Sequence, residues 1–245
     1  MAYDDSTGSI VLFGGQLDTA GSGGGLPLAA DTWTWNGADW TQQSPAASPP
    51  QSASAAMDYD QTSRVVLAVV DDSAGKSETW QWDGRSWTQL SPGQAPANPK
   101  QGAGMAYSTS VSASVLFGTQ YVLGSAGDGD TWAYSANTWK DYAAVTGDPA
   151  PRSGPALAAD QNGGVVMFGG GGSGYNFFND TWTWAGSWTK KSPTLSPASR
   201  TGGQLAFDST CGLDVLYGGE LTTGQQVTYL SDTWVWDGSG WTKVG

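Results

Sequence analysis

The sequence predicts an all-β fold, a β-propeller of five blades in which each blade is a four-stranded antiparallel sheet. One short pattern, an acid followed by Thr-Trp, one residue, an aromatic and a further Trp, occurs five times and contains all fourteen tryptophans. The first Trp of each copy recurs at spacings of 47, 52, 50 and 52 residues, a period typical of repeat architectures. Each repeat also holds four short β-type segments and shows no helical periodicity. The copies begin at Asp31, Glu78, Asp130, Asp180 and Asp232.

The second repeat shows how each strand is predicted. A β-branched run over 65–70 suits a strand buried on both faces, and the alternation over 79–82 suits a strand with two unlike faces. Asp83-Gly84 provides the positive φ of a tight hairpin. The predicted strands of this repeat cover 54–59, 65–70, 79–82 and 86–89.

Pro-rich segments occur once per repeat, between the fourth strand of one repeat and the first strand of the next. This regular position favours blade-to-blade crossings over domain linkers. We therefore expect a single domain over 1–245, with blades at about 1–48, 49–97, 98–149, 150–197 and 198–245.

Several motifs resemble the kelch repeat. A hydrophobic strand ends in Gly-Gly at Gly14-Gly15, Gly169-Gly170 and Gly218-Gly219, and an Asn-Asp-x-Trp element follows at 179–182. Arg152 and Arg200 stand where a kelch first strand begins. The chain is similar to kelch-like propellers of bacterial, often exported, proteins, and to the central propeller of galactose-oxidase-like proteins. Blade 2 lacks the glycine doublet and blade 3 keeps only Gly118, so these blades depart from the pattern.

The resemblance implies six or seven blades, whereas this chain has five repeats. We expect a monomer that forms a closed five-blade ring with a weak seam between blades 1 and 5. An open arc and a fragment of a longer propeller remain as alternatives.

The repeated residues are predicted to be structural. Tryptophans at one position in every blade suit blade-to-blade packing better than sugar stacking. The acid before each Thr-Trp is expected to accept backbone N–H bonds, in preference to forming a ring of carboxylates around the channel. The glycine doublets are expected to permit close backbone approach.

Composition excludes several classes of partner. The chain has 22 acidic and 10 basic residues, no histidine, and a net charge of -12, so it lacks the basic patch that nucleic acids require. No apolar stretch is long enough to insert into a membrane. Cys211 is the single cysteine, which leaves the redox compartment open. An extracellular location would follow if a signal segment lies upstream.

Without histidine, the chain cannot build the copper site of galactose-oxidase-like proteins, a Ser-His-Asp triad or most catalytic zinc sites. We therefore expect no cofactor, no metal and no catalytic residue of these types. Glycosidase chemistry by two carboxylates remains open, although the sequence singles out no pair.

Ligand recognition is expected in the loops that break the repeat, between the second and third strands of each blade. Their non-repeated aromatics are candidate contacts, as are two arginines that would pair with an acidic ligand group or with a nearby Asp. These candidates are Tyr121, Tyr175, Phe177, Phe178, Tyr229, Arg152 and Arg200. The expected function is a non-catalytic binding or scaffold propeller that recognises a protein or an extracellular glycan. The alternative is a carbohydrate-active enzyme using Asp or Glu at the channel mouth.

Overall fold

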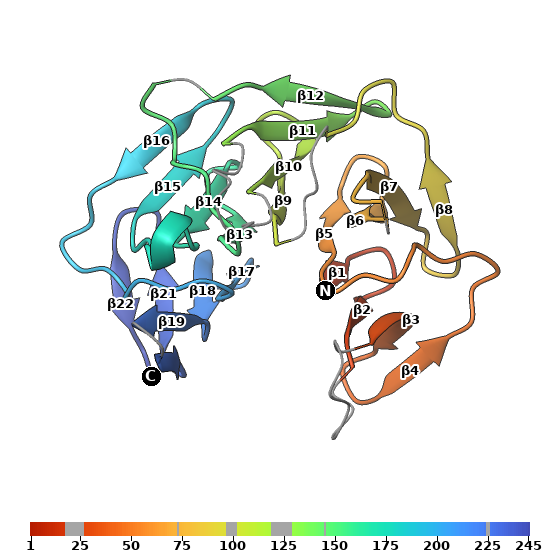
Figure 1. Cartoon of the computed structure of the whole chain (residues 1–245), viewed down its shortest axis with the longest axis horizontal. Helices are drawn as coiled ribbons and strands as arrows, with labels where there is room; N and C mark the ends of the chain where they lie inside the picture. The colour runs from red at the N-terminus through yellow and green to blue at the C-terminus, as the bar shows by residue number, and fades with distance from the viewer. Residues whose placement is uncertain (18–26, 73, 97–101, 119–128, 145, 224–225) are drawn as a thin grey trace. The chain divides into compact units, whose positions relative to one another are not determined.

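The computed structural model describes residues 1–17, 27–72, 74–96, 102–118, 129–144, 146–223 and 226–245 (Figure 1). It is all-β, with five four-stranded antiparallel sheets that form the blades of a five-blade β-propeller, as the sequence predicts. The chain divides into two compact units. Unit 1 comprises Met1–Gln101 and Tyr134–Lys140, and unit 2 comprises Gly102–Ala133 and Asp141–Gly245. Within the described residues, no helix is long and apolar enough to cross a membrane.

Unit 1 holds the first two blades. Blade 1 consists of β1 (Ala2–Asp4), β2 (Ser9–Gln16), β3 (Leu28–Trp35) and β4 (Trp40–Gln43). Blade 2 consists of β5 (Ala56–Asp60), β6 (Val65–Asp71), β7 (Ser77–Trp82) and β8 (Trp87–Leu90). In both blades the strands follow chain order across the sheet. The run over 66–70 is buried on both faces of β6, as its β-branched sequence predicts.

Blade 3 consists of β9 (Gly104–Ser108), β10 (Ala113–Phe117), β11 (Thr131–Ser135) and β12 (Thr138–Tyr142). Most of the hairpin between β11 and β12 belongs to unit 1, and the other strands belong to unit 2. This hairpin lacks the glycine that all four other blades carry at this turn, at Gly37, Gly84, Gly186 and Gly238. Instead, Ala136 and Asn137 adopt the left-handed conformation, with φ of 49° and 58°.

Unit 2 also holds blades 4 and 5. Blade 4 consists of β13 (Ala156–Ala159), β14 (Val165–Phe168), β15 (Thr181–Trp184) and β16 (Trp188–Lys191), with the 3₁₀ turn η1 (Ser173–Tyr175) between β14 and β15. Blade 5 consists of β17 (Gln204–Asp208), β18 (Leu213–Tyr217), β21 (Thr233–Trp236) and β22 (Trp241–Lys243). An additional two-stranded hairpin, β19 (Glu220–Thr223) and β20 (Gln226–Tyr229), separates β18 from β21.

The apolar core lies between consecutive blades. In unit 1, Val11 and Phe13 of blade 1 pack against Val66, Trp82 and Trp87 of blade 2. In unit 2, similar clusters join blade 3 to blade 4 and blade 4 to blade 5. The prediction that the tryptophans are core residues holds for blades 2 to 5, whose tryptophans are all buried.

Blade 1 differs from the prediction for the tryptophans. Trp33 and Trp35 are partly buried, and Trp40 is 42% exposed. The reason is one of position, since these side chains lie on the face of the blade opposite to the one that blade 2 covers.

A tryptophan–threonine hydrogen bond recurs between consecutive blades. The Trp at the start of each fourth strand donates its indole N–H to the Thr hydroxyl in the third strand of the preceding blade. The four bonds are Trp87 to Thr32 at 2.8 Å, Trp139 to Thr79 at 2.9 Å, Trp188 to Thr131 at 2.7 Å and Trp241 to Thr181 at 2.8 Å. The Thr of the repeated motif is therefore an acceptor for the next blade.

The glycine doublets permit close backbone approach, as expected. Gly169 has φ of 69°, and a Cβ there would lie 2.7 Å from the carbonyl oxygen of Arg200. A side chain at this position would force the first strand of blade 5 away from blade 4.

Candidate functional site

The two candidate arginines are buried inside their own blades. Arg152 donates two hydrogen bonds to Asp180, at 2.6 and 3.3 Å, and one to the Gly169 carbonyl at 2.8 Å. Arg200 forms the same arrangement with Asp232, at 2.7 and 3.0 Å, and with the Gly218 carbonyl at 2.9 Å. Of the two partners that the sequence left open, the nearby Asp is the one that the structure shows.

These ion pairs perturb the acids. Burial raises the pKa of Asp180, but the hydrogen bonds and the charge of Arg152 outweigh it, so the net pKa lies below its ordinary value. Hydrogen bonds from Arg200, opposed by burial and aided by Trp234, lower the pKa of Asp232 to about 2. Both acids are therefore held as anions by their own blade, and are not available to a ligand as proton donors.

The repeated acids also bond to the motif itself, and here the expectation of backbone N–H donors needs correction. In four blades the acid accepts the indole N–H of the Trp two residues later. The pairs are Asp31 with Trp33, Glu78 with Trp80, Asp180 with Trp182 and Asp232 with Trp234. The period of two residues along a strand places both side chains on one face, which explains this partner.

Blade 3 is the exception. Asp130 accepts the backbone N–H of Ala144 at 3.1 Å, and the Trp132 indole N–H has no hydrogen-bond partner among the described residues.

The segment between β14 and β15, which we call the insert of blade 4, folds back on its blade. Phe178 donates its backbone N–H to the Gly170 carbonyl, and its ring lies 4.0 Å from the Arg152 guanidinium carbon. Phe177 forms a bridge with Gly171, and both aromatic side chains are partly buried. This is the arrangement in which the aromatics cover their own loop. Tyr175 ends η1, its side chain is outside the described part of the structure, and Tyr121 lies outside the described residues.

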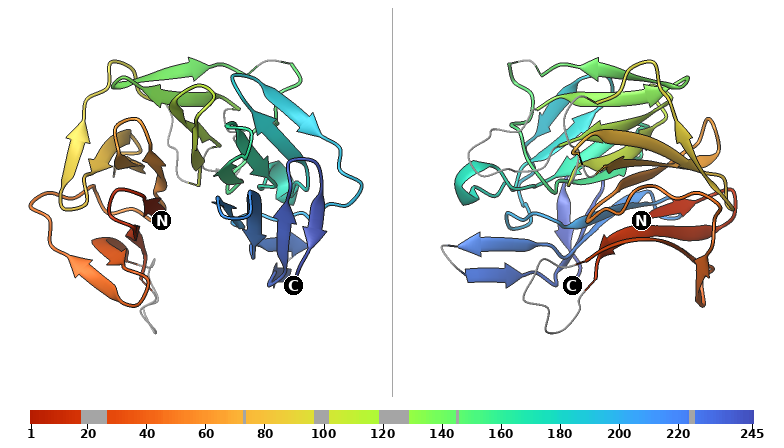
Figure 2. Two further views of the ribbon diagram at one scale, coloured as in Figure 1. Left: turned by 180° about the vertical axis from the view of Figure 1, so that it is seen from behind. Right: turned by 45° about the vertical axis from the view of Figure 1, so that its right-hand side comes forward.

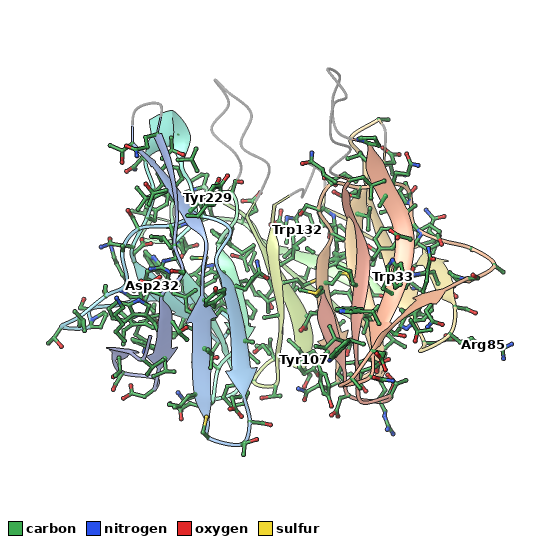
Figure 3. The ribbon with its side chains drawn as sticks, turned by 90° about the horizontal axis from the view of Figure 1, so that it is seen from below. Trp33, Arg85, Tyr107, Trp132, Tyr229 and Asp232 are labelled. Atoms are coloured by element: carbon green, nitrogen blue, oxygen red, sulfur yellow. The ribbon has the colours of Figure 1, made fainter. Side chains whose placement is uncertain are left out.

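The insert of blade 5, which lies between β18 and β21, is different. It stands away from its blade as the β19–β20 hairpin (Figure 2). All four residues of β20 are exposed, and Tyr229 is 79% exposed. Thr201 bridges Glu220 at the base of the hairpin and donates its hydroxyl to the Ser153 carbonyl of the blade 4 crossing. Figure 2 shows η1 and the hairpin on the same side of unit 2. In Figure 3, Tyr229 lies nearer to that side than Asp232 does.

Sequence reasoning missed this hairpin and the exposed Val227. The segment over 220–231 was expected to be a loop. Alternation of apolar and polar residues, with Val227 and Tyr229 two positions apart, was the available signal.

The chain has the fold of YjhT. The solved structure of YjhT, a kelch-type propeller, matches with a TM-score of 0.71 at 15% sequence identity, over 97% of this chain and 81% of that chain. No protein-family model matches the sequence, and no curated protein matches it either. At this identity the similarity to YjhT shows the fold alone, so chemistry has to be judged from the residues of this chain.

Among the carboxyls that the structure describes, two have clearly raised pKa values, and both are in the blades. Burial raises the pKa of Asp58 to about 7, partly opposed by a backbone hydrogen bond and supported by Asp60. Burial, and then the charge of Asp160, raise the pKa of Asp214 to about 8. Asp58 Oδ2 and Asp214 Oδ1 are buried without hydrogen-bond partners among the described residues. One oxygen of each carboxyl is therefore closed to solvent in this structure.

No group of three or more acidic or Cys side chains within the described residues is placed to hold a metal ion.

Proposed function

We propose that this protein is a non-catalytic binding or scaffold propeller that recognises a protein or an extracellular glycan through the loop side of unit 2, with the β19–β20 hairpin as the main contact. The observation that carries the proposal is the exposure of Tyr229, which is 79%, on a hairpin that projects from blade 5. A large aromatic side chain that a strand presents to solvent is an effective anchor for a partner.

The hairpin suits either ligand class through different atoms. Val227 and Tyr229 alternate along β20 and so present one apolar face. A sugar ring would stack on the tyrosine, whereas an extended protein segment would pair with the backbone edge of β20. The net charge of -12 disfavours strongly acidic ligands.

Several residues proposed from the sequence play supporting roles in this arrangement. Arg152 and Phe178 fix the base of the blade 4 insert, and Arg200 fixes the first strand of blade 5. Their effect on a ligand is indirect, because they hold the inserts at the positions where the ligand would meet them.

The enzymatic alternative receives no support from the described carboxyls. A glycosidase requires an accessible acid of raised pKa opposite a second carboxylate. The acids with raised pKa here, Asp58 and Asp214, have buried oxygens.

The test is a binding screen of the purified chain against defined polysaccharides and extended peptides, with reducing ends monitored for hydrolysis. Tyr229→Ser should weaken a binding interaction by about tenfold or more, as expected for an anchor residue. Leu195→Ser is the matched control, because Leu195 is also an exposed apolar residue of unit 2 but lies on the crossing between blades 4 and 5. Equal loss in both variants, or hydrolysis of any glycan, would refute the proposal.

A further inference from the structure

The β19–β20 hairpin has one edge that is joined to unit 2 and one edge that is open in the described part of the chain. At the edge of β19, Glu220 and Thr201 exchange two backbone hydrogen bonds of 2.9 Å. The sheet has two strands, so no described strand pairs with the other edge of β20. All four residues of β20 are exposed. β20 is therefore an edge strand that can accept a further strand.

The pairing register identifies the backbone groups at this open edge. In an antiparallel pair, opposite residues alternate between those that bond to each other and those whose N–H and C=O point away. Glu220 directs both groups to Thr201, so Glu220 and the opposite residue Tyr229 are of the second kind. Val227, two positions earlier, is of the same kind. The N–H and C=O of Val227 and Tyr229 therefore point away from the hairpin, and they form no hydrogen bond with a described residue.

The same two residues also provide the exposed apolar side chains. Val227 is 44% exposed and Tyr229 is 79% exposed. Because they are two positions apart, their side chains lie on one face, together with those of the opposite residues Thr222 and Glu220. Two donors, two acceptors and two apolar side chains thus repeat along this strand at about 6.8 Å.

β20 lacks the charges that the outer strands of blades 4 and 5 carry. β16 ends in Lys190 and Lys191, and β22 ends in Lys243. A charged side chain on an edge strand disfavours the addition of another strand. The sequence of β20 is Gln-Val-Thr-Tyr, which is uncharged and contains three residues of high β propensity. Its composition favours pairing with a further strand.

We infer that the ligand of this hairpin is an extended protein segment, which adds to β20 as a third strand. The inference rests on the proposed function, because it names the ligand class of the same hairpin. A peptide backbone offers N–H and C=O groups with the period of Val227 and Tyr229, whereas the hydroxyls of a glycan have no fixed alternation of donors and acceptors.

Charge further defines the segment. Glu220 shares the face of Tyr229, and the chain as a whole has a net charge of -12. Both favour a basic residue in the ligand and disfavour an acidic one. The expected ligand therefore has apolar residues at alternate positions, with neutral or basic residues between them.

The test is calorimetric titration of the full chain with three capped octapeptides, in which valine alternates with lysine, threonine or glutamate. The lysine peptide should bind most tightly and the glutamate peptide most weakly. If none of the three binds, the inference is overturned. Binding of a polysaccharide but of no peptide would overturn the inference and leave the proposed function standing, whereas binding of neither would overturn both.

Two variants of one residue separate the backbone from the side chain. Val227→Pro removes an N–H that points away from the hairpin, which an edge strand tolerates, and Val227→Ala is the matched control that keeps this N–H. Neither changes the net charge, so a purely electrostatic attraction of the lysine peptide would be the same in both. Val227→Ala should weaken binding about threefold, and Val227→Pro at least about tenfold more. Equal affinities of the two variants would overturn the inference.

Amide hydrogen exchange of the wild-type chain provides a readout that no variant is needed for. The amides of Val227 and Tyr229 should exchange rapidly in the free chain, and the lysine peptide should slow both by about tenfold or more. The amide of Thr228, which the register places in a bonded pair with Leu221, should change much less. Protection of Val227 and Tyr229 in the free chain would show that the edge is already covered, and would overturn the inference. Peptide binding without protection of these two amides would do the same.

Discussion

Trp87 of blade 2 donates its indole N–H to the hydroxyl of Thr32 in blade 1, 2.8 Å away, and both side chains are buried. The bond links the last strand of one blade to the third strand of the blade before it. It gives the Thr before the first Trp of repeats 1 to 4 a role, because its hydroxyl accepts from the next blade.

Removing this bond should cost stability, and a double-mutant cycle separates the bond from the packing that the smaller Phe ring loses. Trp87→Phe leaves the buried Thr32 hydroxyl without its donor, and we expect a loss of about 1–3 kcal/mol in the free energy of unfolding. Thr32→Val should remove the same bond from the other side. Chemical denaturation of both single variants and the double variant forms a double-mutant cycle, and strict additivity would show that the bond contributes nothing.

Breaking a buried ion pair should be more costly. Arg200→Met leaves Asp232 without its guanidinium partner, and the expected loss is about 3–5 kcal/mol at neutral pH. The double variant Arg200→Met with Asp232→Asn removes the orphaned charge and should recover part of that loss. Because Arg200 lowers the pKa of Asp232 from 3.8 to about 2, the contribution of the pair should be present above pH 4 and lost as pH falls through 2. Thermal unfolding across this range measures it, and a pH-independent cost would contradict the assignment.

Asp214 should make the protein less stable in alkaline solution. Its pKa is raised from 3.8 to about 8, so the folded chain holds a proton that the unfolded chain releases. Stability should therefore fall as pH rises from about 4 to about 8. Asp214→Asn keeps the shape of the side chain but cannot titrate, so the variant should show a flatter slope. The comparison is clearest close to pH 8, because Asp58, with its pKa of about 7, titrates mainly at lower pH. An unchanged slope in the variant would rule out Asp214 as its source.

Two glycines with the same φ allow the cost of a steric clash to be distinguished from the cost of backbone strain. Gly169 and Gly174 both have φ of 69°, but only Gly169 has backbone atoms, the carbonyl oxygens of Arg200 and Phe178, within 4 Å of an added Cβ. Gly174→Ala should cost about 1 kcal/mol for the left-handed conformation alone. Gly169→Ala should cost clearly more, since the crossing into blade 5 must also move. Equal losses of unfolding free energy in the two variants would show that the close approach is relaxed at little cost.

Most of the fold was predictable from the sequence because its signals are local and repeated. The β-branched run over 65–70 and the Asp83-Gly84 turn each specify their own strand or hairpin, and five copies reinforce one another. Arg152 was recognised as a candidate from its place before a first strand, but its partner was left open between a ligand and an Asp. The choice depended on Asp180, which is 28 residues away along the chain and only adjacent once β13 and β15 lie in one sheet.

The sequence by itself determined five blades of four strands, the burial of the tryptophans in blades 2 to 5, and the unsuitability of the chain for histidine-dependent chemistry. Only the tertiary structure decided which residues are exposed, because every repeat has nearly the same local sequence but not the same neighbours. Trp87 is buried because blade 1 covers it, whereas Trp40, which occupies the same position in the motif, is 42% exposed. Tyr229 was one aromatic among several in the inserts, and its exposure follows from the hairpin that carries it away from blade 5.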